Sequence, residues 1–162
     1  MPKKSISRNR KQENKQQIKT RKQTANKKKK TLYKNKKDDA SSIVKMFIEM
    51  LNMVKLYHWK THSYAQHKAT DELYSKMNEH IDSFVEIMLG KEESRIKMIE
   101  KKIELIDTSN VLEFKKRIYE YRDFLIEMDM YFDKKKDTDL LSVRDELLGD
   151  VNQFLYLLSF TK

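Results

Sequence analysis

Cysteine is absent from this chain, and its 162 residues include only one proline and two glycines. The lack of thiols excludes disulfides and cysteine-ligated zinc sites. Sandwiches and barrels need many tight turns, which are built mostly from Gly and Pro, so two glycines exclude these folds. They also exclude the Gly-rich phosphate-binding loops of P-loop and dinucleotide-binding proteins. No apolar run approaches the roughly 20 residues of a membrane-spanning helix, which predicts a protein without membrane contacts.

The net charge of +10 is an average over two very different segments. Residues 1–37 hold 16 basic residues against one acid, Glu13, and so carry +15, whereas residues 38–162 hold 19 basic and 24 acidic residues and carry −5. Large apolar residues are few and scattered in the basic segment, so we expect residues 1–38 to be a disordered tail. The basic residues of this tail are Lys3, Lys4, Arg8, Arg10, Lys11, Lys15, Lys19, Arg21, Lys22, Lys27, Lys28, Lys29, Lys30, Lys34, Lys36 and Lys37.

A flexible arm of this charge density releases counterions from phosphate backbones whatever the base sequence. We therefore predict that the tail binds DNA non-specifically through these residues. A solubilising or targeting extension is the alternative, and the run Lys27–Lys30 fits a nuclear-localisation element. The tail has neither the apolar core of a secretory signal nor the amphipathic stripe of a mitochondrial one. This predicts an intracellular, non-secreted protein of the cytoplasm or nucleoid, with the nucleus or a virion as alternatives.

Apolar residues recur at intervals of three and four over most of residues 39–162, which predicts four long amphipathic helices. Asp38 to Ser41 offer N-cap and acidic first-turn residues for a first helix that runs to about residue 61. A capping box at Ser63 to Gln66 opens the second helix, and Gly90 is expected to end it. Residues 109–110 open a third helix with an apolar stripe to Phe132, and residues 137–139 cap the fourth.

The lengths of the connections predict how these helices are arranged. The first and second helices, and the third and fourth, are joined by short connections and should be antiparallel neighbours. Residues 91–108 form a long connection, in which we expect a short helix around Arg95–Leu105. One long crossover is the layout of a ferritin-like four-helix bundle. The predicted fold is therefore all-α, with a basic tail (1–38) and one ferritin-like bundle (39–162).

All four histidines lie between positions 58 and 80: His58, His62, His67 and His80. On the second helix, His67, Asp71, Asp82 and Glu86 fall within about 100° of one another, opposite the apolar stripe. Imidazole and carboxylate together are typical ligands of iron, zinc or manganese. The alternative is that this stripe is only the solvated face of an amphipathic helix, and that His58 is a packed residue with a satisfied hydrogen bond.

The distance between these ligands predicts a site shared by two chains. His67 and Asp82 are 15 residues apart, or about 22 Å along a helix, too far to bind one ion in a single chain. Two copies of the second helix that pack antiparallel across a two-fold axis would bring His67 of one chain to Asp82 and Glu86 of the other. We therefore expect a homo-oligomer with its metal site between subunits.

The motif Tyr57-His58-Trp59, followed by His67, Asp71, Asp82 and Glu86, resembles the Dps family of mini-ferritins (DNA-binding proteins from starved cells). The resemblance covers about residues 41–160, includes the start of the last helix, and extends to the Lys-rich tail. Three features depart from the family pattern. The interval between the first two histidines is shorter, a loop glycine is missing, and Ile87 replaces an arginine. Because of the shorter loop, His62 is an alternative ligand to His58.

The resemblance implies a hollow dodecamer of two-fold dimers that oxidises Fe(II), stores the ferric product and protects DNA from oxidative damage. Hydrogen peroxide or oxygen would be the oxidant of this ferroxidase activity. The implied iron ligands are His58, His67, Asp71, Asp82 and Glu86. Tyr57 and Trp59 would act as radical sinks beside the site, with core or interface packing as the alternative for both. The alternative function is a non-enzymatic DNA-condensing or virion-packaging protein that keeps the bundle but has lost iron oxidation.

Overall fold

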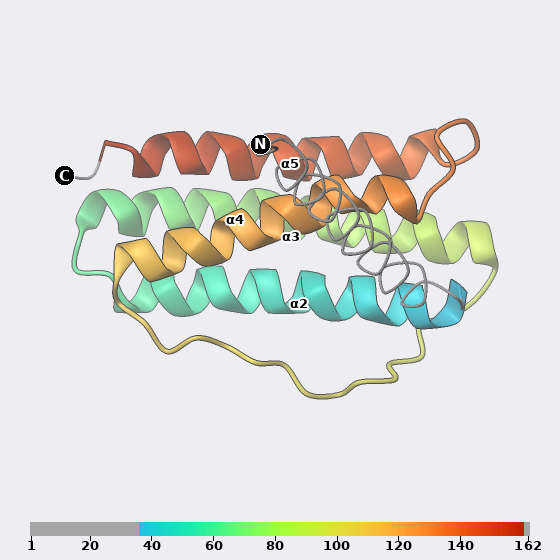
Figure 1. Cartoon of the computed structure of the whole chain (residues 1–162), viewed down its shortest axis with the longest axis horizontal. Coiled ribbons are helices and arrows are strands. Elements are labelled where there is room, and N and C mark those ends of the chain that lie inside the picture. The colour runs from blue at the N-terminus through green and yellow to red at the C-terminus, as the bar shows by residue number, and fades with distance from the viewer. Residues whose placement is uncertain (1–35, 161–162) are drawn as a thin grey trace, which may run out of the picture. The chain divides into compact units, whose positions relative to one another are not determined.

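The computed structural model describes residues 36–160, which fold into four long helices and a single 3₁₀ turn (Figure 1). The helices are α2 (Lys36–Lys60), α3 (Tyr64–Glu92), α4 (Val111–Glu127) and α5 (Thr138–Leu158), and the turn η1 (Met128–Met130) follows α4. The predicted all-α four-helix fold is therefore confirmed. The tail assigned to DNA binding lies almost entirely outside the described residues. Within residues 36–160, no helix has the length and apolar content needed to cross a membrane.

The chain direction gives the bundle its topology. α2 and α3 run antiparallel, as do α4 and α5, and residues 93–110 cross the whole length of the bundle between α3 and α4 (Figure 1). As a result α3 and α4 point the same way. α3 packs on α5, and α5 packs on α4. This is the ferritin-like arrangement with one long crossover that the connection lengths predicted.

The predicted apolar stripes form the core. Phe47 of α2 is fully buried and meets Phe84 of α3 and Phe124 of α4 edge to face, with ring centroids 5.3 and 6.1 Å apart. Full burial of such a side chain stabilises the fold by about 1.5–3 kcal/mol. The buried stripe residues of α3, α4 and α5 are Leu73, Met77, Ile81, Phe84, Met88, Phe114, Ile118, Tyr121, Leu125, Leu140, Leu147, Val151, Phe154 and Leu158.

Helix starts were predicted well where a side chain caps the backbone. The Ser63 hydroxyl accepts the N–H of Gln66 and starts α3, and Asn110 accepts the N–H groups of Leu112 and Glu113 and starts α4. Asp137 also occupies the N-cap position of α5 but makes no side-chain cap bond there. Its carboxylate instead lies 3.0 Å from Lys91 Nζ, at the end of α3.

Three predicted boundaries are wrong, and a tertiary contact lies near each of them. α2 begins at Lys36, so Ser41 lies inside it, and the buried Ser41 hydroxyl accepts the N–H of Ile99 from the crossover. α3 continues past Gly90 to Glu92, where Lys91 pairs with aspartates of α5 and its N-cap, and Glu93 leaves the helix at φ 47°. The long helix predicted to reach Phe132 ends at Glu127 and η1.

The α4 terminus depends on a buried arginine of α5. Arg144 donates from Nη1 to the carbonyl of Leu125 at 2.8 Å and from Nη2 to Asp129 at 2.7 Å. The Leu125 carbonyl, one of the last of α4, thus accepts from Arg144 as well as from the N–H of Met128 at the helix end. The apolar periodicity could not show this, because it continues beyond the point where the backbone turns.

The short helix predicted around Arg95–Leu105 is also wrong, because residues 93–110 form no helix. α3 has 29 residues and is about 43 Å long, a length that the 18-residue crossover must span with turns at both ends. Fully extended, the crossover reaches about 59 Å, but with eleven of its residues in a helix it would reach only about 40 Å. The extended form is the one that is long enough.

Candidate metal centre

The short connection between α2 and α3 brings two histidines into contact. His58 is in the last turn of α2 and His67 is in the first turns of α3, and their rings stack with centroids 3.9 Å apart and 24° between planes. His58 Nδ1 lies 3.0 Å from the backbone oxygen of His67, and His67 Nδ1 lies 3.1 Å from the backbone oxygen of His58. Each imidazole is thus held by the main chain of the other residue.

These contacts assign the ring hydrogens. A carbonyl oxygen only accepts hydrogen bonds, so both Nδ1 atoms carry hydrogen. In the neutral rings, both Nε2 atoms are then acceptors with a free lone pair, the form in which imidazole binds metals. Metal-binding histidines usually donate their second ring N–H to a carbonyl or carboxylate in this way. The pair therefore has the tautomer and the support that a metal ligand needs.

One carboxylate lies close to this pair. Asp71 Oδ1 is 3.9 Å from His58 Nε2 and 3.6 Å from Lys55 Nζ, and the Asp71 side chain is more than half exposed. Lys55 in turn lies over the rings of Tyr74 and Trp59, 4.8 and 5.9 Å from their centroids. The Asp71 carboxylate therefore lies within reach of both the lysine and the imidazole and is open to solvent.

The two aromatic neighbours of His58 occupy opposite environments. Tyr57 is fully buried, stacks on Phe114 at 3.8 Å, and donates its hydroxyl to Gln66 Oε1 at 2.7 Å. Burial raises the Tyr57 pKa, which a hydrogen bond with Thr61 partly offsets. Trp59 is 70% exposed. Tyr57 is thus a core residue, and the radical-sink role of both rings stays a prediction.

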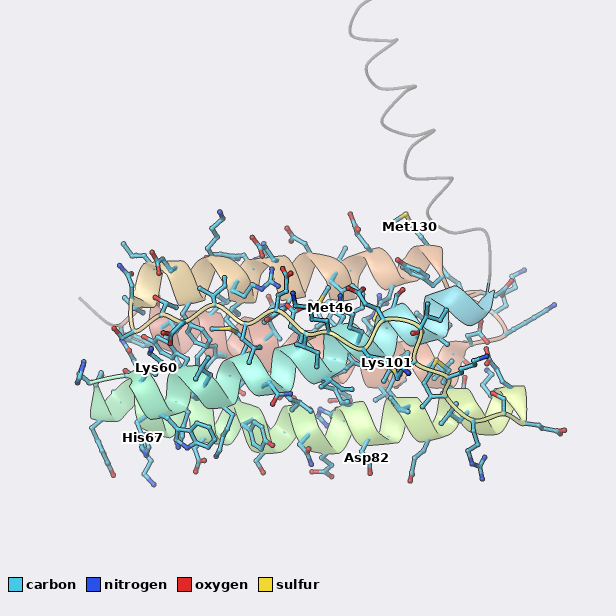
Figure 2. The ribbon with its side chains drawn as sticks, turned by 90° about the horizontal axis from the view of Figure 1, so that it is seen from below. Met46, Lys60, His67, Asp82, Lys101 and Met130 are labelled. Atoms are coloured by element: carbon cyan, nitrogen blue, oxygen red, sulfur yellow. The ribbon has the colours of Figure 1, made fainter. Side chains whose placement is uncertain are left out.

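The remaining predicted ligands lie away from the pair. His62 is exposed in the α2–α3 connection, so His58 and not His62 contacts His67. Asp82 and Glu86 are exposed on α3, and Figure 2 places Asp82 well along that helix from His67. Within the described part of the chain, no three His, Asp or Glu side chains converge as metal ligands. A single chain therefore does not bring the predicted ligands together, as the helical distance indicated.

A buried polar network that the sequence analysis missed fills part of the bundle interior. Glu49 of α2 is 5% exposed, accepts the Tyr121 hydroxyl at 3.2 Å and pairs with the Arg117 guanidinium, which also pairs with Glu120. Burial is the main cause of a raised Tyr121 pKa. The sequence signal that could have indicated this network is an acidic residue among the apolar residues Phe47, Ile48 and Met50. Because Arg117 already neutralises this carboxylate, it is not free to hold iron inside the bundle, where ferritin-like di-iron proteins place their carboxylates.

The fourth histidine belongs to a different contact. His80 Nδ1 lies 2.9 Å from Asp150 Oδ2, which joins α3 to α5. Lys76, one turn earlier on α3, donates to Gln153 of α5 at 3.0 Å. This polar seam stabilises the packing of the two helices, and His80 does not take part in the His58–His67 pair.

Comparison with known proteins places the chain in a family. A family of unknown function (DUF5856) matches residues 58–158. No curated protein and no solved structure matches the chain. The matched residues begin at His58, include His67, Asp71, Asp82 and Glu86, and leave out the basic tail. Because the match covers more than half of the chain, the protein is a member of this family of unknown function, DUF5856.

Proposed function

We propose that the protein is a Dps-like mini-ferritin that oxidises and stores iron and binds DNA through its basic tail. The observation that supports this most directly is the His58–His67 pair. Both rings are fixed by main-chain hydrogen bonds in the tautomer that leaves Nε2 available, and Asp71 lies beside them. A packed histidine needs only one satisfied hydrogen bond, so two stacked imidazoles whose Nε2 atoms carry no hydrogen, beside an exposed carboxylate, support a role in binding a cation.

Iron enters this proposal as substrate, and the ligands come from two copies of the chain. His67 of one copy and Asp82 and Glu86 of the second would hold the first Fe(II), while His58 and Asp71 would hold a second, weaker one. The mixed nitrogen and oxygen donors suit Fe(II), and exposed carboxylates leave positions open for oxidant and water. For this pairing, the two α3 helices must pack antiparallel, with the two-fold axis near the middle of α3.

The electrons and protons of the proposed iron oxidation balance without any other reactant. With hydrogen peroxide, two Fe(II) ions each give up one electron, and the peroxide takes up two electrons and two protons to form two waters. The protein residues bind and position the iron; they are not consumed. A hollow dodecamer of two-fold dimers would keep the ferric product apart from solvent peroxide.

Mutations at the pair and along α3 test the iron chemistry. His67→Ala and Glu86→Ala should each reduce Fe(II) oxidation, followed in the near-UV, at least tenfold with unchanged helicity. His67 is half-buried and Glu86 is exposed, so their loss opens no closed cavity in the core. Glu146→Ala is the matched control, because this exposed carboxylate is on α5 and outside the proposed site. Unchanged oxidation in both ligand variants would contradict the proposal.

Mixed assemblies test whether the site is shared. His67→Ala subunits mixed with Asp82→Ala subunits leave one intact site in every mixed dimer, so the mixture should recover activity that neither variant has alone. Mixing has to be verified by native mass spectrometry. Absence of recovery in verified mixed dimers would place the site within one chain and overturn the two-chain arrangement.

A second candidate function is a non-enzymatic DNA-condensing protein, of a nucleoid or a virion, with the same bundle. Ile87 in place of an arginine and the shortened interval between His58 and His67 favour it, as does the charge of +15 on the tail. Under this alternative, none of the ligand variants changes iron oxidation, and removal of the tail abolishes the only activity of the protein. The two proposals are therefore separated by the oxidation assay.

A further inference from the structure

The middle of the crossover is an extended segment held at both ends and bare in between. Glu100 pairs with Lys45 at 2.6 Å, and Asp107 pairs with Lys60, both on α2. In Figure 1 the crossover runs on the outer side of α2, and Figure 2, which labels Lys101, shows it passing over the face of that helix. Between the two ion pairs lies the stretch 101–106, which we call the bare stretch.

The backbone of the bare stretch offers hydrogen-bonding groups without partners in the described part of the chain. None of its N–H groups donates to a protein acceptor there, and its one carbonyl contact is from Thr108 N–H to Ile106. Its side chains are exposed except for the half-buried Ile103, and Leu105 and Ile106 are 42% and 41% exposed. An extended, partly apolar segment with a free backbone edge is a template for pairing with another strand.

The sequence of the bare stretch selects a second copy of itself as the partner. Two identical antiparallel strands related by a two-fold axis have one residue opposite itself at the centre. A centre at Lys101, Lys102 or Glu104 places like charges opposite each other, and a centre at Leu105 or Ile106 brings no opposite charges together. A centre at Ile103 places Ile103 opposite itself and Lys102 opposite Glu104 on both sides, with Lys101 opposite Leu105. Such cross-strand pairs favour this register.

We infer that two copies of the protein pair their crossovers antiparallel, with Ile103 at the two-fold axis. An isolated pair of short strands is only marginally stable, so this ladder fixes the register of a dimer in which other surfaces also meet. Ile103 lies near the middle of residues 93–110, at about half the length of the bundle. The α3 pairing under the proposed function has its axis at a similar level, but the crossover contact does not depend on iron binding.

Cross-linking tests the register, because the chain has no native cysteine. In the full-length protein, Ile103→Cys should form a disulfide-linked dimer rapidly with diamide as oxidant, because the two Cβ atoms face each other across the axis. Lys101→Cys is the matched control on the same segment. Its two copies would be about 14 Å apart along the strands, beyond the reach of a disulfide. Equal rates for the two variants, or no dimer from Ile103→Cys, would overturn the inference.

Charge reversal gives an independent measurement. Lys102→Glu or Glu104→Lys places two like-charged pairs in the ladder and should weaken the dimer about tenfold in sedimentation equilibrium, whereas the double reversal should restore it. Hydrogen exchange of residues 101–106 should be slowed in the wild-type dimer and fast in the single variants. If the dissociation constant of the dimer is the same in all these variants, the crossovers do not pair. Iron oxidation is measured on the same samples. A change in dimer affinity can then be distinguished from a failure of the proposed iron oxidation.

Discussion

Arg117→Met tests the buried network directly, because it removes the cation and leaves Glu49 inside the bundle. Glu49 is 5% exposed, and its remaining donor among the described contacts is the Tyr121 hydroxyl at 3.2 Å. Loss of one partner of a buried ion pair costs about 3–5 kcal/mol. The Arg117 side chain is 23% exposed, and water at that end screens the pair. We therefore expect the free energy of unfolding to fall by about 2–3 kcal/mol.

The companion variants separate a coupled pair from two independent residues. Glu49→Gln should cost only about 1 kcal/mol, because Arg117 keeps Glu120 and contact with water. The double variant with Met at both positions should lie within about 1 kcal/mol of the wild type, because no charge is then buried alone.

Urea unfolding followed by far-UV circular dichroism measures these differences. All variants must be compared at one protein concentration, since association shifts the midpoint. Additive losses in the double variant would refute the coupling between Glu49 and Arg117, and with it the argument that this carboxylate is already neutralised.

Three further outcomes are expected. Burial raises the pKa of both Tyr57 and Tyr121. Above pH about 10, the unfolded chain therefore loses protons that the folded one keeps, and stability falls as pH rises. In the folded protein, tyrosinate absorbance should show these two groups ionising at higher pH than the exposed tyrosines. Ionisation of every tyrosine at the same pH would contradict this. His58→Ala should reduce iron oxidation as much as His67→Ala, because these rings are in contact. Substitution of the exposed His62 should have little effect. A mild effect of His58→Ala together with a severe effect of His62→Ala would make His62 the ligand. Deletion of residues 1–37 should abolish DNA gel shifts, and salt should weaken the full-length complex steeply; equal retardation of both forms would remove the tail from DNA binding.

Most of the fold could be predicted from periodicity and capping. The stripe from Ile43 to Tyr57 and the caps at Ser63 and Asn110 are local signals. In the structure the stripe is buried and both caps form. The errors arise where distant residues decide. Arg144 binds the end of α4 from α5, and the length of the bundle requires an extended crossover. Neither appears in a local window of sequence.

The candidate site could be predicted only in part. Spacing on one helix placed Asp82 and Glu86 away from His67, and the structure agrees within a single chain. The contact between His58 and His67 depends on how tightly two helices are joined, so the sequence left His62 as an alternative. Glu49 was not predicted, because the spacing of apolar residues carries no information about a single acidic residue within the stripe.

The hydrogen bonds between His58 and His67 orient both rings before a second subunit docks. Because each Nδ1 is bound to main chain of the same polypeptide, the orientation of the two rings is set when the α2–α3 hairpin folds, before any other subunit arrives. Under the proposed function, an isolated subunit already presents its imidazoles rigidly, so little rotamer entropy is left to lose when iron binds. The subunit that docks contributes only carboxylates, and iron that needs both halves must tighten the contact between them. Iron binding would then stabilise the assembly in addition to the crossover contact.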